Sequence, residues 1–296
     1  MTDTRSARER MRMGRTAVQV GLDRANLLEA WIDRVPTVAH LPGGQPCNFG
    51  ADLAADTSEL TWKAWGEASG MLKQFSEFLD LVGAPAVHKE RLLAQHRRLQ
   101  PKVAGSFIEA RSDGADLGWF VVDPLPLEAA VAEADPSRSL DAFASWARET
   151  GILQVQGIGR SVGGGMTRLA AMLPGGDAVE RHGALAKALG VRQLGDGAAA
   201  LVRGQAGAVG ITLALGLPRS ADDAGVADFG VVLAQPDARA VVELLMLAGL
   251  GTDATLARFE GFLGVDGAVA VVVGARGGKL VPVFKYAAGT DRVGPL

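Results

Sequence analysis

The sequence contains few of the residues that form disulfides or bind metal ions in small proteins. It contains a single cysteine, Cys47, among 296 residues. This excludes a disulfide-bonded scaffold and argues strongly against a cysteine-based metal site. The histidines show no pair four residues apart, which is the spacing of two ligands on one helix face. They are His40, His88, His96 and His182. We therefore expect no metal centre formed by these side chains.

The chain also lacks an excess of charge of either sign. Its formal net charge is −3, and 21% of the residues are charged and 48% hydrophobic, as in a globular protein. No basic face or stripe is visible, so we expect no binding to nucleic acid. Long hydrophobic runs are missing as well. The stretch Ala240–Gly251 contains Glu243 and is shorter than the roughly 20 residues that cross a bilayer.

The first fifteen residues carry five arginines, and no apolar segment follows them. A signal peptide requires such a segment. We interpret this stretch as a solvated arm and expect a soluble, cytoplasmic protein without a membrane partner.

The C-terminal part shows the clearest local pattern. Two β-rich segments, Ala268–Val273 and Lys279–Tyr286, flank the glycine-rich stretch Gly274–Gly278, which predicts a β-hairpin. Two helical stretches precede this hairpin, Ala238–Leu250 and Ala254–Leu263, and their apolar residues lie close to helical spacing.

The same order of elements recurs upstream. The sequence predicts helices at Glu67–Leu81, His88–Leu99, Leu140–Glu149 with Ser139 as N-cap, and Asp177–Leu189 ending at Gly190. Hairpins are predicted from Cys47–Leu53 with Leu60–Trp65, Lys102–Arg111 with Leu117–Asp123, Ile152–Gly159 with Met166–Leu173, and Val209–Leu217 with Ala227–Ala234.

Five hairpins, each with helices before and after it, predict an α+β fold of helix–β-hairpin repeats. This order differs from the alternating strands and helices of a Rossmann sheet. Ten antiparallel strands of this kind can close into a barrel surrounded by helices, which leaves no exposed sheet edge. An open α+β structure with two sheets is the alternative. We expect an N-terminal arm and helix over 1–46 and one repeat domain over 47–290.

This order of elements resembles the ABBA-type (αββα barrel) aromatic prenyltransferases, including those that prenylate cyanobactin peptides. The resemblance covers Cys47 to Tyr286 as a pattern of elements. It implies a ten-stranded barrel with catalysis inside it. The implied reaction transfers an isoprenoid from an allylic diphosphate to an aromatic small molecule or peptide side chain. The resemblance leaves the cofactor open, with Mg²⁺ as a possibility.

The resemblance also implies site residues. Lys63 in Leu60-Thr-Trp-Lys63, Arg168 in Gly163-Gly-Gly-Met-Thr-Arg168 and Lys279 in Gly277-Gly-Lys-Leu280 match cations that would hold the diphosphate. Asp52 matches a carboxylate that would accept a proton during catalysis. Trp62 and Trp119 are expected to line the acceptor pocket and shield the allylic cation. Further candidate phosphate ligands are Arg111, Arg160 and Arg203.

The chain departs from the family pattern in two respects. It has one tyrosine, Tyr286, and 5% aromatic residues, whereas family barrels are rich in tyrosine. The segments Leu117–Asp123 and Ala227–Ala234 carry no cation. These departures keep a second hypothesis open, namely a non-catalytic barrel-like protein that binds a hydrophobic ligand or a polypeptide. The string Gly159-Arg-Ser-Val-Gly163 matches a hydrolase elbow, but its β–turn–β context argues against that function.

Overall fold

The computed structural model describes residues 6–18, 25–38, 48–111, 114–163, 165–173, 176–205, 207–216, 225–250, 254–276 and 279–288. The described residues form two compact units. The first comprises those within 1–123, 253–268 and 285–294, and the second those within 124–252 and 269–284.

The first unit contains the first two predicted hairpins. β1 (Asn48–Ala54) pairs with β2 (Glu59–Glu67), β2 pairs with β3 (Val103–Arg111), and β3 pairs with β4 (Gly114–Val121), all antiparallel. The strand β13 (Val283–Ala288) lies beside β1, and its residues from Lys285 onward belong to this unit. Cys47, predicted to begin the first strand, lies outside the described residues.

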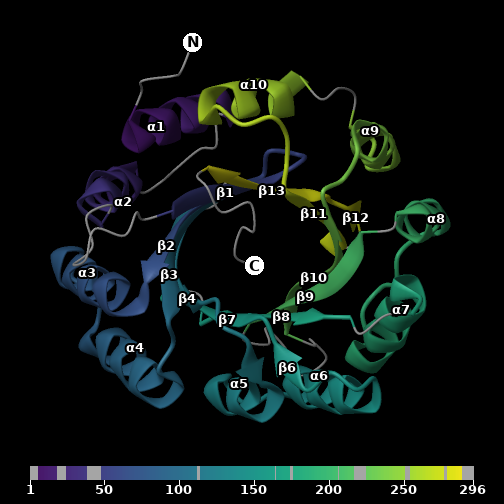
Figure 1. Cartoon of the computed structure of the whole chain (residues 1–296), viewed down its shortest axis with the longest axis horizontal. Coiled ribbons are helices and arrows are strands. Elements are labelled where there is room, and N and C mark those ends of the chain that lie inside the picture. The colour runs from purple at the N-terminus through teal and green to yellow at the C-terminus, as the bar shows by residue number, and fades with distance from the viewer. Residues whose placement is uncertain are drawn as a thin grey trace. The chain divides into compact units, whose positions relative to one another are not determined.

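Helices pack on one face of these strands (Figure 1). Leu60, Trp62 and Ala64 alternate along β2 on that face and are at most 1% exposed. Burial of apolar side chains such as these is the dominant favourable contribution to folding stability. The helices of this unit are α1 (Ala7–Val18), α2 (Ala25–Val38), α3 (Ala68–Leu81), α4 (Ala86–Leu99) and α10 (Ala254–Leu263).

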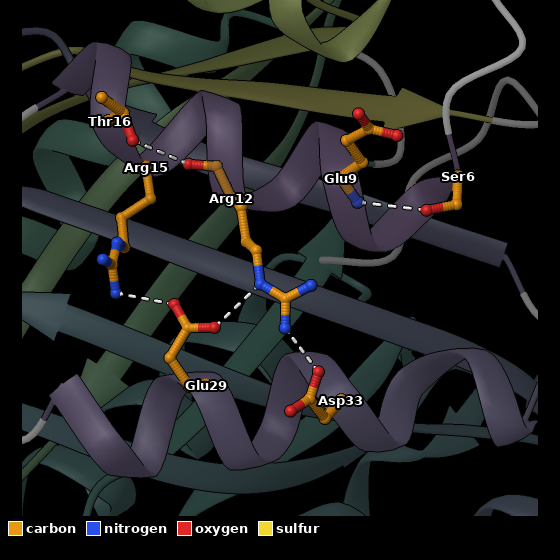
Figure 2. Close-up of polar contacts among 7 residues, drawn as sticks. All are labelled: Ser6, Glu9, Arg12, Arg15, Thr16, Glu29 and Asp33. Atoms are coloured by element: carbon orange, nitrogen blue, oxygen red, sulfur yellow. Dashed lines mark hydrogen bonds and ion pairs between the residues drawn. The ribbon is translucent and has the colours of Figure 1, made fainter.

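The expectation of a solvated N-terminal arm is wrong for residues 7–18, which form α1. Met11 on this helix is fully buried. Arg12 pairs with Glu29 and Asp33 of α2, and Arg15 lies 3.0 Å from Glu29 (Figure 2). Arg12 and Arg15 occupy the side of this amphipathic helix that faces α2, and Arg10 donates to the carbonyl of Leu263 in α10. The number of arginines in this stretch therefore conceals the apolar side that packs.

The second unit contains the third and fourth predicted hairpins and most of the fifth, whose last residues from Lys285 onward belong to the first unit. Its strands β7 (Gly157–Ser161), β8 (Thr167–Met172), β9 (Ala208–Leu215), β10 (Val226–Ala234) and β11 (Ala270–Arg276) pair antiparallel in chain order. β12 (Lys279–Leu280) pairs with β11. A separate small sheet joins β5 (Leu125–Pro126) and β6 (Gln154–Val155). The helices of this unit are α5 (Leu127–Glu133), α6 (Arg138–Glu149), α7 (Ala178–Leu189), α8 (Asp196–Gly204) and α9 (Ala238–Leu247).

Helix ends follow local capping chemistry. Asp177 caps α7 by accepting from the backbone N–H groups of Val179 and Glu180, and Gly190 closes it with φ +69°. The predicted end at Gly190 is confirmed, and the predicted first residue, Asp177, is the N-cap one position before the helix. The predicted N-cap Ser139 is wrong: Ser137 caps α6 by accepting from Leu140 N–H, and Ser139 lies buried within the helix.

The α+β class of helix–β-hairpin repeats is confirmed, because both strands of every predicted hairpin are present. Within the described part of the chain, no helix has the length and apolarity needed to cross a membrane.

Candidate functional site

The sheet of the first unit separates its side chains into two faces. On the face that packs against helices, Trp62 stacks on Phe259 of α10, with ring centroids 5.7 Å apart. On the same face, Trp119 donates a hydrogen bond to Gln95 of α4, and its ring centroid lies 6.1 Å from that of Phe75. The two predicted pocket tryptophans are therefore core residues between strands and helices.

The opposite face carries a cluster of polar side chains, which we call the charged face. Alternation along each strand and the cross-strand register bring these residues to the same side. Most of them are buried, with Glu109 at 2% and Lys63 at 6% exposure. The charged face consists of Asp52, Glu59, Thr61, Lys63, Glu109, Arg111, Asp116 and Lys285.

Asp52 is a point of convergence on this face. The ammonium groups of Lys63 and Lys285 both contact Asp52 Oδ2, the latter at 3.3 Å. The side chain of Asp52 is 14% exposed. Burial raises the pKa of the Asp52 carboxyl, but the positive charges of Lys285 and Lys63 and their hydrogen bonds outweigh burial and hold this pKa below its usual range. Asp52 is therefore ionised at neutral pH.

Further carboxylates lie in one cross-strand row with Asp52. The row runs from Asp52 through Thr61 and Glu109 to Asp116. Arg111 Nη1 lies 2.7 Å from Glu109 Oε1. The charged face thus holds four carboxylates (Asp52, Glu59, Glu109 and Asp116) and three cations (Lys63, Arg111 and Lys285).

An aromatic cluster adjoins the charged face on the same side of the sheet. It consists of Trp65, Phe107 and Phe120, which are 3–8% exposed. Phe107 stands directly opposite Lys63 across β2 and β3, so the two clusters are neighbours. Glycines make room for the rings: a Cβ atom on Gly105 would lie 2.3 Å from Phe120.

The sequence-predicted residues therefore separate into groups. Asp52 and Lys63 are brought together, whereas Trp62 and Trp119 lie on the other face of the sheet. Arg168 and Lys279 belong to the second unit. Arg168 is half-buried on β8, opposite Gly159 and Ala214, and Lys279 is exposed on β12.

The other candidate arginines have different surroundings. Arg160 is 4% exposed and donates to the carbonyl of Glu133 at 3.0 Å while pairing with Asp135, so it ties α5 to β7. Arg203 lies in α8 and pairs with Asp177. Arg111 belongs to the charged face.

The predicted site residues did not include Lys285, Glu109, Asp116 or the aromatic cluster. Lys285 is 233 positions from Asp52 along the chain, so no local pattern links the two residues. The strand alternation of Glu109 and Asp116 was readable, but their cross-strand pairing was not.

Among the described residues, no group of three or more histidine, cysteine, aspartate or glutamate side chains is placed to hold a metal ion. The carboxylates of Asp52 and Glu109 face Lys63, Lys285 and Arg111 instead.

Comparison with known proteins gives one sequence relative. A PH domain-containing protein of Dictyostelium discoideum is 26% identical over 153 residues, which is 50% of this chain and 33% of the relative. The match thus covers about a third of the length of that relative. No protein-family profile matches the chain.

Solved structures match over almost the whole chain. The 5-dimethylallyltryptophan synthase of Streptomyces coelicolor has a TM-score of 0.61 at 11% identity, covering 96% of both chains. The NotF prenyltransferase has a TM-score of 0.58 at 12% identity, covering 96% of this chain and 92% of its own. The 6-dimethylallyltryptophan synthase of Micromonospora olivasterospora, in complex with DMASPP and Trp, has a TM-score of 0.52 at 13% identity, covering 93% of this chain and 100% of its own. The chain therefore has the fold of the ABBA-type prenyltransferases, the α+β fold class that the sequence predicts.

Proposed function

We propose that this protein is a cytoplasmic prenyltransferase-like enzyme that transfers an isoprenoid from an allylic diphosphate to an aromatic small molecule or peptide side chain. The observation that carries the proposal is the contact of two lysines with Asp52 directly beside an aromatic cluster on one sheet face. The shared fold supports it, since one solved neighbour holds DMASPP and Trp. Fold alone does not define function, so the proposal depends on this site.

Lys63 and Lys285 are the proposed ligands of the diphosphate leaving group. Lys63 and Lys285 converge from β2 and β13 on one point. Two ammonium groups held in place before the reaction stabilise the negative charge that develops on diphosphate as the carbon–oxygen bond breaks. Arg168 and Lys279 remain proposed diphosphate ligands.

The aromatic cluster supplies the environment of the allylic cation. Phe107, opposite Lys63, and its neighbours Trp65 and Phe120 are almost fully buried. Their ring faces attract positive charge, and their burial excludes water that would capture the cation. We propose these three residues for the role that the sequence assigned to Trp62 and Trp119.

A carboxylate accepts the proton that the aromatic ring loses. Asp52 is the residue the sequence indicates, and Glu109 and Asp116 lie in the same cross-strand row. A carboxylate within hydrogen-bond reach of the ring carbon performs this general-base step.

Calorimetric titration with a non-hydrolysable thio analogue of dimethylallyl diphosphate tests the proposal. We expect saturable micromolar binding that weakens at least tenfold in Lys63→Ala and in Lys285→Ala, because each variant removes one charged contact. Lys89→Ala is the matched control, since Lys89 lies on α4 and pairs with the exposed Asp80. Titrations with and without magnesium show whether the metal contributes. Absence of binding by this analogue and by longer ones would refute the proposal.

A non-catalytic binding protein is the second candidate, and one observation favours it. Each cation of the charged face lies within 3.3 Å of a carboxylate, so an incoming anion competes with internal partners. Such a protein would hold a hydrophobic ligand or a polypeptide. It would leave dimethylallyl diphosphate intact in the presence of aromatic acceptors.

A further inference from the structure

Asp52 has an uncommon arrangement of partners. One of its oxygens, Oδ2, accepts hydrogen bonds from the ammonium groups of both Lys63 on β2 and Lys285 on β13. The two lysine side chains are 8% and 11% exposed. The carboxylate thus occupies the position between two ammonium groups where an external anion would gain most.

The other charged groups around Asp52 are mostly acidic. Thr61 stands opposite Asp52 on β2, and beyond it lie Glu109 of β3 and Asp116 of β4. Glu59 of β2 stands opposite Arg111 of β3, and Arg111 in turn contacts Glu109. The four carboxylates and three cations of this face leave it with one excess negative charge before any ligand binds.

Moving the Asp52 carboxylate away from the two lysines would therefore carry a high free-energy cost if the carboxylate stayed ionised. A buried carboxylate without a compensating charge is strongly disfavoured. A diphosphate bound to Lys63 and Lys285 would add more negative charge beside it. Protonation removes this penalty, because a neutral carboxyl is tolerated in a buried position and can donate a hydrogen bond.

We propose that Asp52 is an internal counter-ion that the diphosphate displaces from Lys63 and Lys285, and that Asp52 takes up one proton when the diphosphate binds. This inference rests on the proposed function, because it requires an allylic diphosphate at these lysines. The proton comes from the solvent and stays on the Asp52 carboxyl while the ligand is bound.

Two consequences follow for the site. Diphosphate affinity falls about tenfold for each unit of rising pH, because one proton is taken up per ligand bound. A protonated Asp52 cannot accept the proton that the aromatic ring loses, so that step goes to Glu109 or Asp116, the other carboxylates of the same row.

Calorimetry in two buffers of different ionisation enthalpy measures the proton uptake directly. The probe is the thio analogue of dimethylallyl diphosphate at pH 8, about two units above the second pKa of a phosphoryl group. We expect uptake of about one proton by the unmodified chain and by Asp56→Asn, and none by Asp52→Asn. Asp56 is a suitable control because it is an exposed turn residue between β1 and β2.

The affinity of Asp52→Asn gives a second readout. This variant should bind the analogue at least tenfold more tightly at pH 8 and with little pH dependence, because the competing carboxylate is gone. Proton uptake that persists in Asp52→Asn, or binding without proton uptake in the unmodified chain, would overturn the inference and leave the proposed function standing. Failure of all variants to bind would instead refute the proposed function.

Discussion

Asp52 and His182 solve the problem of burying an ionisable side chain in opposite ways. Asp52 stays charged because two ammonium groups surround one of its oxygens. His182 of α7 is 2% exposed and stacks on Phe229 with ring centroids 4.2 Å apart, and neither of its nitrogens has a hydrogen-bond partner among the described residues. An imidazolium there would be an uncompensated buried charge, so His182 is neutral in the folded protein.

His182 makes folding stability depend on pH. Burial lowers the pKa of His182 from 6.5 to about 4, so the unfolded chain binds the proton more readily. The stability is fully present above pH 6.5 and is lost as the pH falls toward 4, by on the order of 3 kcal/mol. Urea unfolding at pH 7 and pH 4.5 measures this loss.

The variant His182→Leu isolates the effect. It retains an apolar side chain against Phe229 and should lack this part of the pH dependence. The lowered pKa of Asp52 does not interfere, because the ordinary value of that carboxyl is 3.8 and its contribution is lost only below that pH. An equal loss of stability in the variant would show that other groups titrate in this window.

The helix α1 is attached by apolar packing and by ion pairs, and their contributions to stability can be compared. Met11 is fully buried, whereas Arg12, which bridges Glu29 and Asp33 of α2 (Figure 2), has a side chain that is 42% exposed. Exposed ion pairs contribute about 0–1 kcal/mol, and truncating a buried methionine costs about 2–5 kcal/mol. Apolar packing should therefore dominate the attachment of α1.

Denaturant unfolding of two variants tests this ranking. Met11→Ala should lower the free energy of unfolding by about 2–5 kcal/mol, at low and high salt alike. Arg12→Ala should lower it by less than about 1 kcal/mol, and the loss should shrink at high salt. A larger effect of Arg12→Ala would mean that the ion pairs and not the core fix this helix.

The elements themselves were largely predictable because their signals are local. Alternating apolar residues and glycine turns located both strands of every hairpin, and the helix α10 (Ala254–Leu263) has the predicted bounds. Over 1–46 one helix was expected where the structure has two, α1 and α2. The helices α5 and α8 and the two-residue strand β5 were missed, and β6 was not distinguished from β7 within the predicted strand Ile152–Gly159. The arginines of α1 and the shortness of α5, β5 and β6 conceal their periodicity.

The site was harder to predict because it depends on which face of a strand meets the helices. Alternation places Trp62 and Lys63 on opposite faces of β2 but does not say which face is packed. The contact of Trp62 with Phe259 settles this, and it makes Trp65 the tryptophan beside Lys63. The pairing of Asp52 with Lys285 depends on β13 lying beside β1, which no local pattern encodes.

At the scale of the whole molecule, the fold is shared with solved prenyltransferases at only 11–13% identity. A fold at this distance fixes the arrangement of strands and leaves the chemistry to the side chains they present. Here the chain contains a single tyrosine, and the charged face holds four carboxylates and three cations. The proposed enzyme therefore relies on lysines and on tryptophan and phenylalanine rings.

Transfer of the isoprenoid is the most direct test of this account. The protein is incubated with dimethylallyl diphosphate and a panel of acceptors that contains tryptophan, indole, phenols and aromatic peptides, and products are identified by mass spectrometry. We expect a prenylated acceptor from the unmodified chain and from Lys89→Ala, and at least 100-fold less from the double variant Lys63→Ala/Lys285→Ala. Dimethylallyl diphosphate that stays intact with every acceptor, or equal product from the double variant, would contradict the central claim.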